Sequence, residues 1–170
     1  MSNPPRETIP GQSSAAASFA RDEWELLTTL PRRVLIAATS AEADTQRRTV
    51  AEGLAGIEAI AAGRSSDSAL VREVVTAIYA EEDADAPTAE EFDDRAAGIT
   101  QTLAACRHAT EVLSARGTPV DAAAYRSWLT DVAAAVCGAA KTGGVLGIGG
   151  ARISVAERRF LDELRDSLVA

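Results

Sequence analysis

The segment from Lys141 to Ser154 holds the residues best suited to chemistry in this chain. It contains the only lysine, followed by closely spaced glycines and then by Arg152. Successive glycine N–H groups and the N-terminus of a following helix attract anions, and flanking cations strengthen that attraction. The segment therefore predicts a site for an anion or another small molecule, formed by Lys141, Gly143, Gly144, Gly147, Gly149, Gly150 and Arg152.

The same segment also has a structural interpretation. Val145, Leu146 and Ile148 stand between the glycines, whereas a flexible linker would use serine there. These bulky apolar residues favour a loop packed between the last two helices. Known nucleotide patterns do not fit, because Arg152 stands where G-x-G-x-x-G needs its last glycine, and the phosphate-loop glycines before Lys141 are missing. Packing and anion binding both remain open.

No residue set predicts catalysis. His108 is the only histidine, and neither Cys106 nor Cys137 has the neighbours of a nucleophile or a zinc ligand. The acidic residues between positions 81 and 94 offer oxygen ligands, but Thr88 occupies the position where a calcium-binding EF-hand loop requires glycine. We therefore expect a solvated acidic loop, no cofactor and no enzymatic residues.

Apolar residues at helical spacing predict about six helices, and no segment alternates in the manner of a strand. The seams of the expected helices are Trp24, Leu27 and Leu30; Val50, Leu54, Ile57 and Ala61; Leu70, Val71, Val74, Val75 and Ile78; Phe92, Ile99, Leu103, Cys106 and Leu113; Tyr125, Trp128, Leu129, Val132 and Val136; and Phe160, Leu161, Leu164 and Leu168. Laid together, these seams predict an all-α bundle. Pro31 leaves two alternatives for the first segment, one kinked helix or two short ones.

Capping signals predict where these helices begin and end. Residues 88–91 and 154–157 read Thr-x-x-Glu and Ser-x-x-Glu, which are capping boxes. Residues 118–119 place a proline after a hydroxyl cap, and either residue of the pair 66–67 can cap the third helix. Gly63 suits the end of the second helix.

Length and composition predict one domain. The chain has 170 residues, of which 46% are hydrophobic. This length is sufficient for one domain with a hydrophobic core but too short for two full domains. Residues 1–20 are rich in proline, serine and alanine and are expected to form a disordered tail, with the bundle over 21–170. The two halves of the chain show a weak internal echo, meaning a similar spacing between a tryptophan and a later glutamate. Trp24 precedes Glu52 by 28 residues, and Trp128 precedes Glu157 by 29 residues, which is compatible with a duplication.

Charge and hydropathy exclude several classes of partner. The net charge of −8 disfavours nucleic acid and anionic membranes. No run of apolar residues approaches the roughly 18 that a membrane span needs, and no secretory signal is evident. We therefore expect a cytoplasmic protein.

The stretch Ala-Ala-Lys-Thr-Gly-Gly-Val-Leu-Gly-Ile-Gly-Gly over 139–150, followed by a Ser-x-x-Glu helix start, resembles a group of small uncharacterised bacterial all-helical proteins. This resemblance implies no known activity. More loosely, the chain is similar to TerB-like tellurite-resistance domains, which are all-α and contain helix–acidic loop–helix units. That similarity implies a metal-binding stress protein with Glu42, Asp44 and Glu157 as weak candidate ligands, although Gly149, Gly150 and Arg152 stand where the family has acidic residues.

Three hypotheses follow. The first is a non-enzymatic cytoplasmic interaction or scaffold module that binds a protein partner or a second copy of itself. The second is a binder of anions or small molecules, with or without enzymatic activity, that uses the glycine-rich loop 143–150. The third is a TerB-like metal-binding protein.

Overall fold

In the computed structural model, the described residues are 14–42, 46–80, 94–139 and 153–169, with only the backbone described for 46–49. These residues form six α-helices, two short 3-10 helices and no strand, which confirms the predicted all-α class. In chain order the elements are η1 (Ala15–Ser18), α1 (Arg21–Ser40), α2 (Gln46–Ala62), η2 (Gly63–Ser65), α3 (Ala69–Ala80), α4 (Arg95–Arg116), α5 (Pro119–Ala139) and α6 (Val155–Ser167). No helix in the described ranges has the length and apolar content that crossing a bilayer requires.

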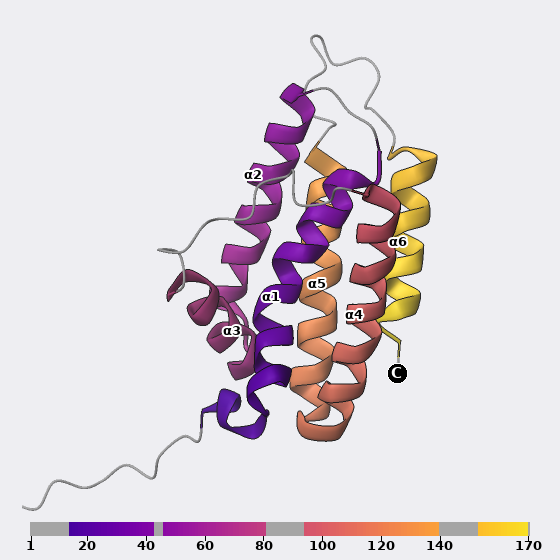
Figure 1. Cartoon of the computed structure of the whole chain (residues 1–170). Coiled ribbons are helices and arrows are strands. Elements are labelled where there is room, and N and C mark those ends of the chain that lie inside the picture. Colours follow the sequence, from indigo (N-terminus) through magenta and orange to yellow (C-terminus); the bar gives the residue numbers. More distant parts are fainter. Residues whose placement is uncertain (1–13, 43–45, 81–93, 140–152, 170) are drawn as a thin grey trace, which may run out of the picture.

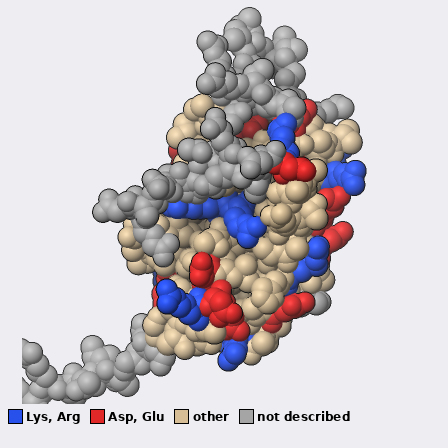
Figure 2. Space-filling model, in the orientation of Figure 1, with Lys and Arg blue, Asp and Glu red and all other residues tan. Residues whose placement is uncertain are grey.

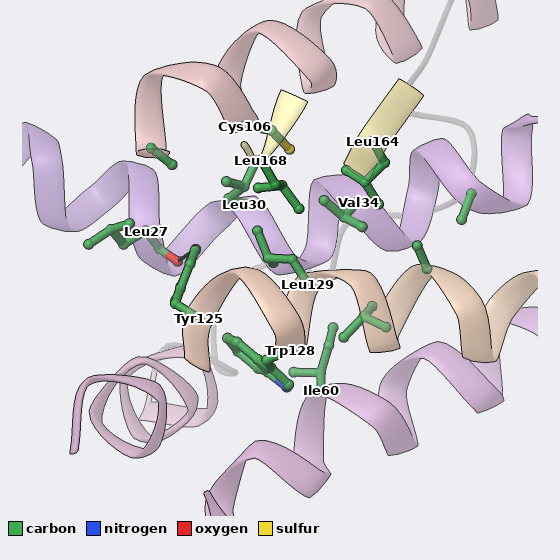
Figure 3. Packing of buried hydrophobic residues seen from close by; sticks show 14 of the residues in the cluster. Leu27, Leu30, Val34, Ile60, Cys106, Tyr125, Trp128, Leu129, Leu164 and Leu168 are labelled. Carbon is green, nitrogen blue, oxygen red and sulfur yellow. Dashed lines mark hydrogen bonds between the residues drawn. The ribbon is translucent and has the colours of Figure 1, made fainter. Parts of the chain in front are cut away.

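Helix α5 lies at the centre of the bundle and packs against the five other α-helices. Figure 1 shows α2 and α3 on one side of the α1–α5 pair, and α4 and α6 on the other. Leu129, Val132 and Val136 of α5 are completely buried. Figure 3 shows Leu129 pointing towards Leu30 and Val34 of α1, so the two central helices meet through apolar side chains.

Small residues bring α2 close to its neighbours. A Cβ added to Gly56 would lie 2.6 Å from Leu35 Cδ1 and 2.8 Å from Val136 Cγ2. A Cβ added to Gly63 would lie 2.8 Å from the indole nitrogen of Trp128. Gly63 follows the end of α2 as predicted. Its small size is required by close packing against the Trp128 ring, which the sequence pattern did not reveal.

The N-termini of α3 and α5 share one carboxylate. The backbone N–H of Asp121 donates to Thr118 Oγ1 at 3.1 Å, which confirms the predicted start of α5. Ser68 caps α3, because the Val71 N–H donates to its hydroxyl oxygen at 3.3 Å, so the prediction of a cap at residue 66 or 67 was wrong. The Ser68 hydroxyl in turn donates to Asp121 Oδ1 at 2.6 Å. The contact between Ser68 and Asp121 is tertiary, so no local sequence pattern indicates that it holds the hydroxyl that caps α3.

Part of the expected disordered tail belongs to the fold. Residues 1–13 lie outside the described residues, but η1 is bound to α3 through the carboxylate of Glu73. The Ser14 hydroxyl donates to Glu73 Oε2 at 2.6 Å, and the N–H groups of Ala15 and Ala16 donate to its two oxygens at 3.0 Å each. One acidic side chain therefore satisfies N–H groups at the start of η1 and attaches this part of the expected tail to α3.

Two further expectations concern helix boundaries. Helix α1 runs without a break from Arg21 to Ser40 through Pro31, so the alternative of two short helices was wrong. Helix α4 is described from Arg95 onward, with Asp94 as its N-cap. The capping box predicted at residues 88–91 lies outside the described residues.

Candidate functional site

The residues of the predicted anion site all lie outside the described residues; they are Lys141, Gly143, Gly144, Gly147, Gly149, Gly150 and Arg152. The described chain ends at Ala139 on one side of this segment and resumes at Ile153 on the other. Ile153 is partly buried and packs against the hydrophobic core. For residues 140–152, anion binding and close packing therefore both remain predictions.

Glu157 has a clear local role in α6. Its backbone N–H donates to Ser154 Oγ at 3.1 Å, and the Ser154 N–H donates to Glu157 Oε2 at 2.6 Å. This reciprocal pair is the predicted capping box, which is confirmed. Only 2% of the Glu157 surface is exposed. Because Oε2 of this candidate metal ligand accepts the Ser154 N–H, at least one of its carboxylate oxygens is used at the start of α6.

The described residues do not assemble the other candidate ligands into a metal site. Glu42 follows α1, and its backbone carbonyl accepts a 2.6 Å hydrogen bond from Arg95 Nη2 at the start of α4. Asp44 lies outside the described residues. Within the described ranges, no three histidine, cysteine, aspartate or glutamate side chains are arranged to hold a metal ion. His108 is exposed on α4, with its Nδ1 atom 3.5 Å from Glu111 Oε2.

The two glutamates of the internal echo are both buried in helices. Glu52 of α2 is 3% exposed and Glu157 of α6 is 2% exposed. A buried carboxylate is unfavourable unless it is paired, and each of these residues does have interaction partners. The sequence does not indicate that either side chain is buried, because burial of a glutamate leaves no signature in a hydropathy pattern.

The least expected feature is an exposed apolar row on α2, which we call the α2 stripe and which consists of Val50, Leu54 and Ile57. Their exposed fractions are 59%, 58% and 52%. Because they stand at i, i+4 and i+7, they form a continuous row along one face of the helix. The expectation that this seam faces another helix of the bundle was wrong.

A second row on α2 faces the core instead. Glu52, Gly56 and Ile60 are buried, and Gly56 allows the close approach to α1 and α5 described above. This buried row is less hydrophobic than the exposed one. Since both rows have helical spacing, their periodicity alone could not show which one the bundle covers.

Charged side chains of both signs lie elsewhere on the surface. On the face shown in Figure 2, acidic and basic side chains lie interspersed. Several pair within one helix, such as Arg159 Nε with Glu163 Oε1 at 2.8 Å and Arg165 Nη1 with Asp162 Oδ1 at 3.1 Å. The other large exposed apolar residues in the described part of the chain, Val120, Val155 and Val169, lie on or just after other helices and form no row with the α2 stripe.

A shallow groove lies between the end of α2, the start of α3 and the outer face of α5. Its volume is about 610 Å³, and small residues such as Ala62, Ser66 and Ala124 line most of it. The carboxylates of Asp67 and Asp131 belong to the lining, which contains no lysine or arginine. The indole N–H of Trp128, at the floor, donates to the Ala59 carbonyl at 3.2 Å. That polar atom is therefore already used within the fold.

Comparison with known proteins adds no assignment to these features. The chain matches no protein-family model, no curated protein and no solved structure.

Proposed function

We propose that this chain is a non-enzymatic helical interaction module that binds a protein through the α2 stripe. The observation that carries the proposal is the exposure of more than half of Val50, Leu54 and Ile57 in one row. Full burial of such a side chain stabilises by about 1.5–3 kcal/mol, so each of these half-exposed residues stands to contribute on the order of 1 kcal/mol when a partner covers it.

The arrangement of the exposed residues distinguishes a docking face from ordinary surface. Single exposed apolar residues such as Val120 or Val169 are common on soluble proteins and need no explanation. Three in a row on one helix provide the i, i+4, i+7 anchors by which amphipathic helices are recognised. The two free cysteines, Cys106 and Cys137, are both buried, and this fits the reducing conditions of the cytoplasm, where we place the protein.

Photo-crosslinking from the α2 stripe tests this function. A benzoylphenylalanine placed at Leu54 in cells that naturally produce the chain is expected to give a discrete covalent adduct, to be identified by mass spectrometry. The matched control is the same group at Val169, which is 72% exposed but lies beyond α6. Adducts that are equally abundant from both positions, or no adduct from Leu54, would contradict the proposal.

A further inference from the structure

The groove between α2, α3 and α5 is lined by two acidic side chains and, within the described part of the chain, by no basic one. We propose that this groove binds a linear organic cation with amino groups at both ends, of the polyamine class. None of the lining residues belongs to the α2 stripe, so the inference concerns a second site and is independent of the proposed function. The shape of the groove, the positions of its carboxylates and the nature of its floor support it.

The shape of the groove suits an extended molecule. Its volume of about 610 Å³ lies within the roughly 300–1,000 Å³ of typical ligand pockets. The lining residues of α5 extend from Val120 to Ala135, which is about 22 Å along the helix axis. The end of α2 and the start of α3 form the opposite side. A long and shallow site of this kind fits an extended chain better than a compact ring.

The two carboxylates lie towards opposite ends of the groove. Asp67 directly precedes Ser68, whose hydroxyl donates to Asp121 Oδ1 at 2.6 Å, so the start of α3 lies beside the start of α5. Asp131 is ten residues further along α5 than Asp121, which is about 15 Å. Carboxylates placed in this way match a cation that is charged at both ends better than a single ammonium group.

Both carboxylates are available to a ligand. Asp67 and Asp131 are exposed, and none of the ion pairs in the described part of the chain includes either of them. The guanidinium of Arg72 lies nearby but is not part of the lining, because it donates to the Ser66 carbonyl at 2.6 Å and its charge acts on Asp121. A cation in the groove would therefore neutralise charges that these arginine contacts leave unpaired.

The floor between the carboxylates suits a hydrocarbon chain. The indole N–H of Trp128 already donates to the Ala59 carbonyl, so the ring offers only apolar surface to a ligand. Small residues such as Ala62 and Ala124 keep the rest of the lining low. Methylene groups that lie across this surface leave water, which stabilises binding. The hydroxyl of Ser127 also lines the groove and can accept a hydrogen bond from an internal ammonium group.

The exposure of both carboxylates predicts weak, salt-dependent binding. Ion pairs between exposed groups contribute little, because solvent and salt screen them. We expect a dissociation constant on the order of 0.1–1 mM at moderate ionic strength, with weaker binding at high salt.

Titration of the full chain with spermine, followed by NMR of its backbone amides, tests the site. Saturable shifts are expected at Ser66, Ala124 and Ser127. Asp131→Asn is expected to raise the dissociation constant about threefold, because it removes one of the two ion pairs. The matched control is Glu111→Gln, which removes the same charge from an exposed carboxylate on α4 and is expected to leave the dissociation constant nearly unchanged.

A second pair of variants tests the groove at constant charge. Ala124→Leu enlarges a lining residue and is expected to weaken spermine binding about tenfold, because it displaces methylene groups from the floor. Ala123→Leu adds the same side chain at the neighbouring exposed position of α5, outside the lining, and is expected to leave binding unchanged. Thermal unfolding verifies that both variants fold.

Three results would overturn the proposal. The first is the absence of shifts, or shifts that spread over acidic residues of every helix without saturating, which would indicate attraction to the net charge alone. The second is an equal effect of Asp131→Asn and Glu111→Gln, and the third is an equal effect of the two leucine variants. Photo-crosslinking from the α2 stripe uses none of these residues, so this proposal and the proposed function can fail separately.

Discussion

The Tyr125 hydroxyl on α5 donates a 2.7 Å hydrogen bond to the backbone carbonyl of Leu27 on α1. In a regular helix this carbonyl would accept from the N–H of residue 31, but Pro31 has none. The tyrosine thus supplies the donor that the proline removes, and it does so in a completely buried position. Burial raises the pKa of Tyr125 well above its usual range, so the hydroxyl keeps its proton at neutral pH. This contact explains how α1 passes through a proline without ending.

Tyr125→Phe is therefore expected to lower the free energy of unfolding by about 1–3 kcal/mol, because it leaves a buried carbonyl without a donor. Urea denaturation measures this loss. The control is a double-mutant cycle with Pro31→Ala, which restores an N–H to the helix. The cost of Tyr125→Phe is expected to be smaller in the Pro31→Ala background. An equal cost in both backgrounds would show that the tyrosine does not replace the missing donor.

Two glycines of α2 are expected to respond oppositely to alanine. Gly56→Ala is expected to destabilise by about 1–3 kcal/mol, because the new methyl group would overlap with Leu35 and Val136. A Cβ on Gly53 meets no atom within 4 Å, so Gly53→Ala is expected to stabilise by up to about 1 kcal/mol through helix propensity. Thermal unfolding of the two variants measures both changes. Equal effects at the two positions would contradict the close packing of α2.

The carboxylate shared by α3 and α5 predicts a contribution to acid sensitivity. The hydrogen bond from Ser68, together with that from Thr118, lowers the pKa of Asp121 below its usual value, despite an opposing effect of partial burial. A carboxyl group with a lowered folded-state pKa stabilises fully above its unfolded-state pKa, near 4, and loses that contribution as pH falls through the lower folded-state pKa.

Asp121→Asn is therefore expected to reduce the slope of stability against pH below about pH 4. Because Asp121 is partly exposed, solvent screening keeps its contribution below about 1 kcal/mol. Urea denaturation at a series of pH values measures the slope, and Ser68→Ala is expected to reduce it in the same direction. If the slope is unchanged in both variants, this carboxylate does not contribute to acid sensitivity.

Glu73 predicts a local effect on the N-terminal segment. Glu73→Ala removes the acceptor of the hydrogen bonds from Ser14, Ala15 and Ala16, so η1 is expected to detach from α3. Hydrogen exchange at the Ala15 and Ala16 amides is expected to accelerate at least about tenfold. Exchange in α5 is expected to change much less, because α5 does not depend on η1. Unchanged exchange in η1 would mean that other contacts hold this segment.

Much of the helical framework was predictable because its signals are local. The hydroxyl of Ser154 and the carboxylate of Glu157 form their capping box within one helical turn, and Pro119 begins α5 as its fixed backbone angle favours. The cap of α3 was predicted wrongly because the hydroxyl chosen, that of Ser68, is held by Asp121, 53 residues later. Residues 66–69 alone therefore do not indicate that Asp121 holds the Ser68 hydroxyl.

The sequence by itself determined that the described part of the chain is helical, where α5 and α6 begin, and where α2 ends. These features could be predicted because local hydrogen bonding and 3.6-residue periodicity depend only on residues that are close together in the sequence. Only the tertiary structure decided which side of α2 the bundle covers. The choice depends on whether Gly56 can approach Leu35 and Val136 of other helices, and that fit turns Glu52 inward and leaves Val50, Leu54 and Ile57 in solvent. Hydrophobicity alone favours burial of Val50, Leu54 and Ile57, whereas steric fit between distant helices buries the other row.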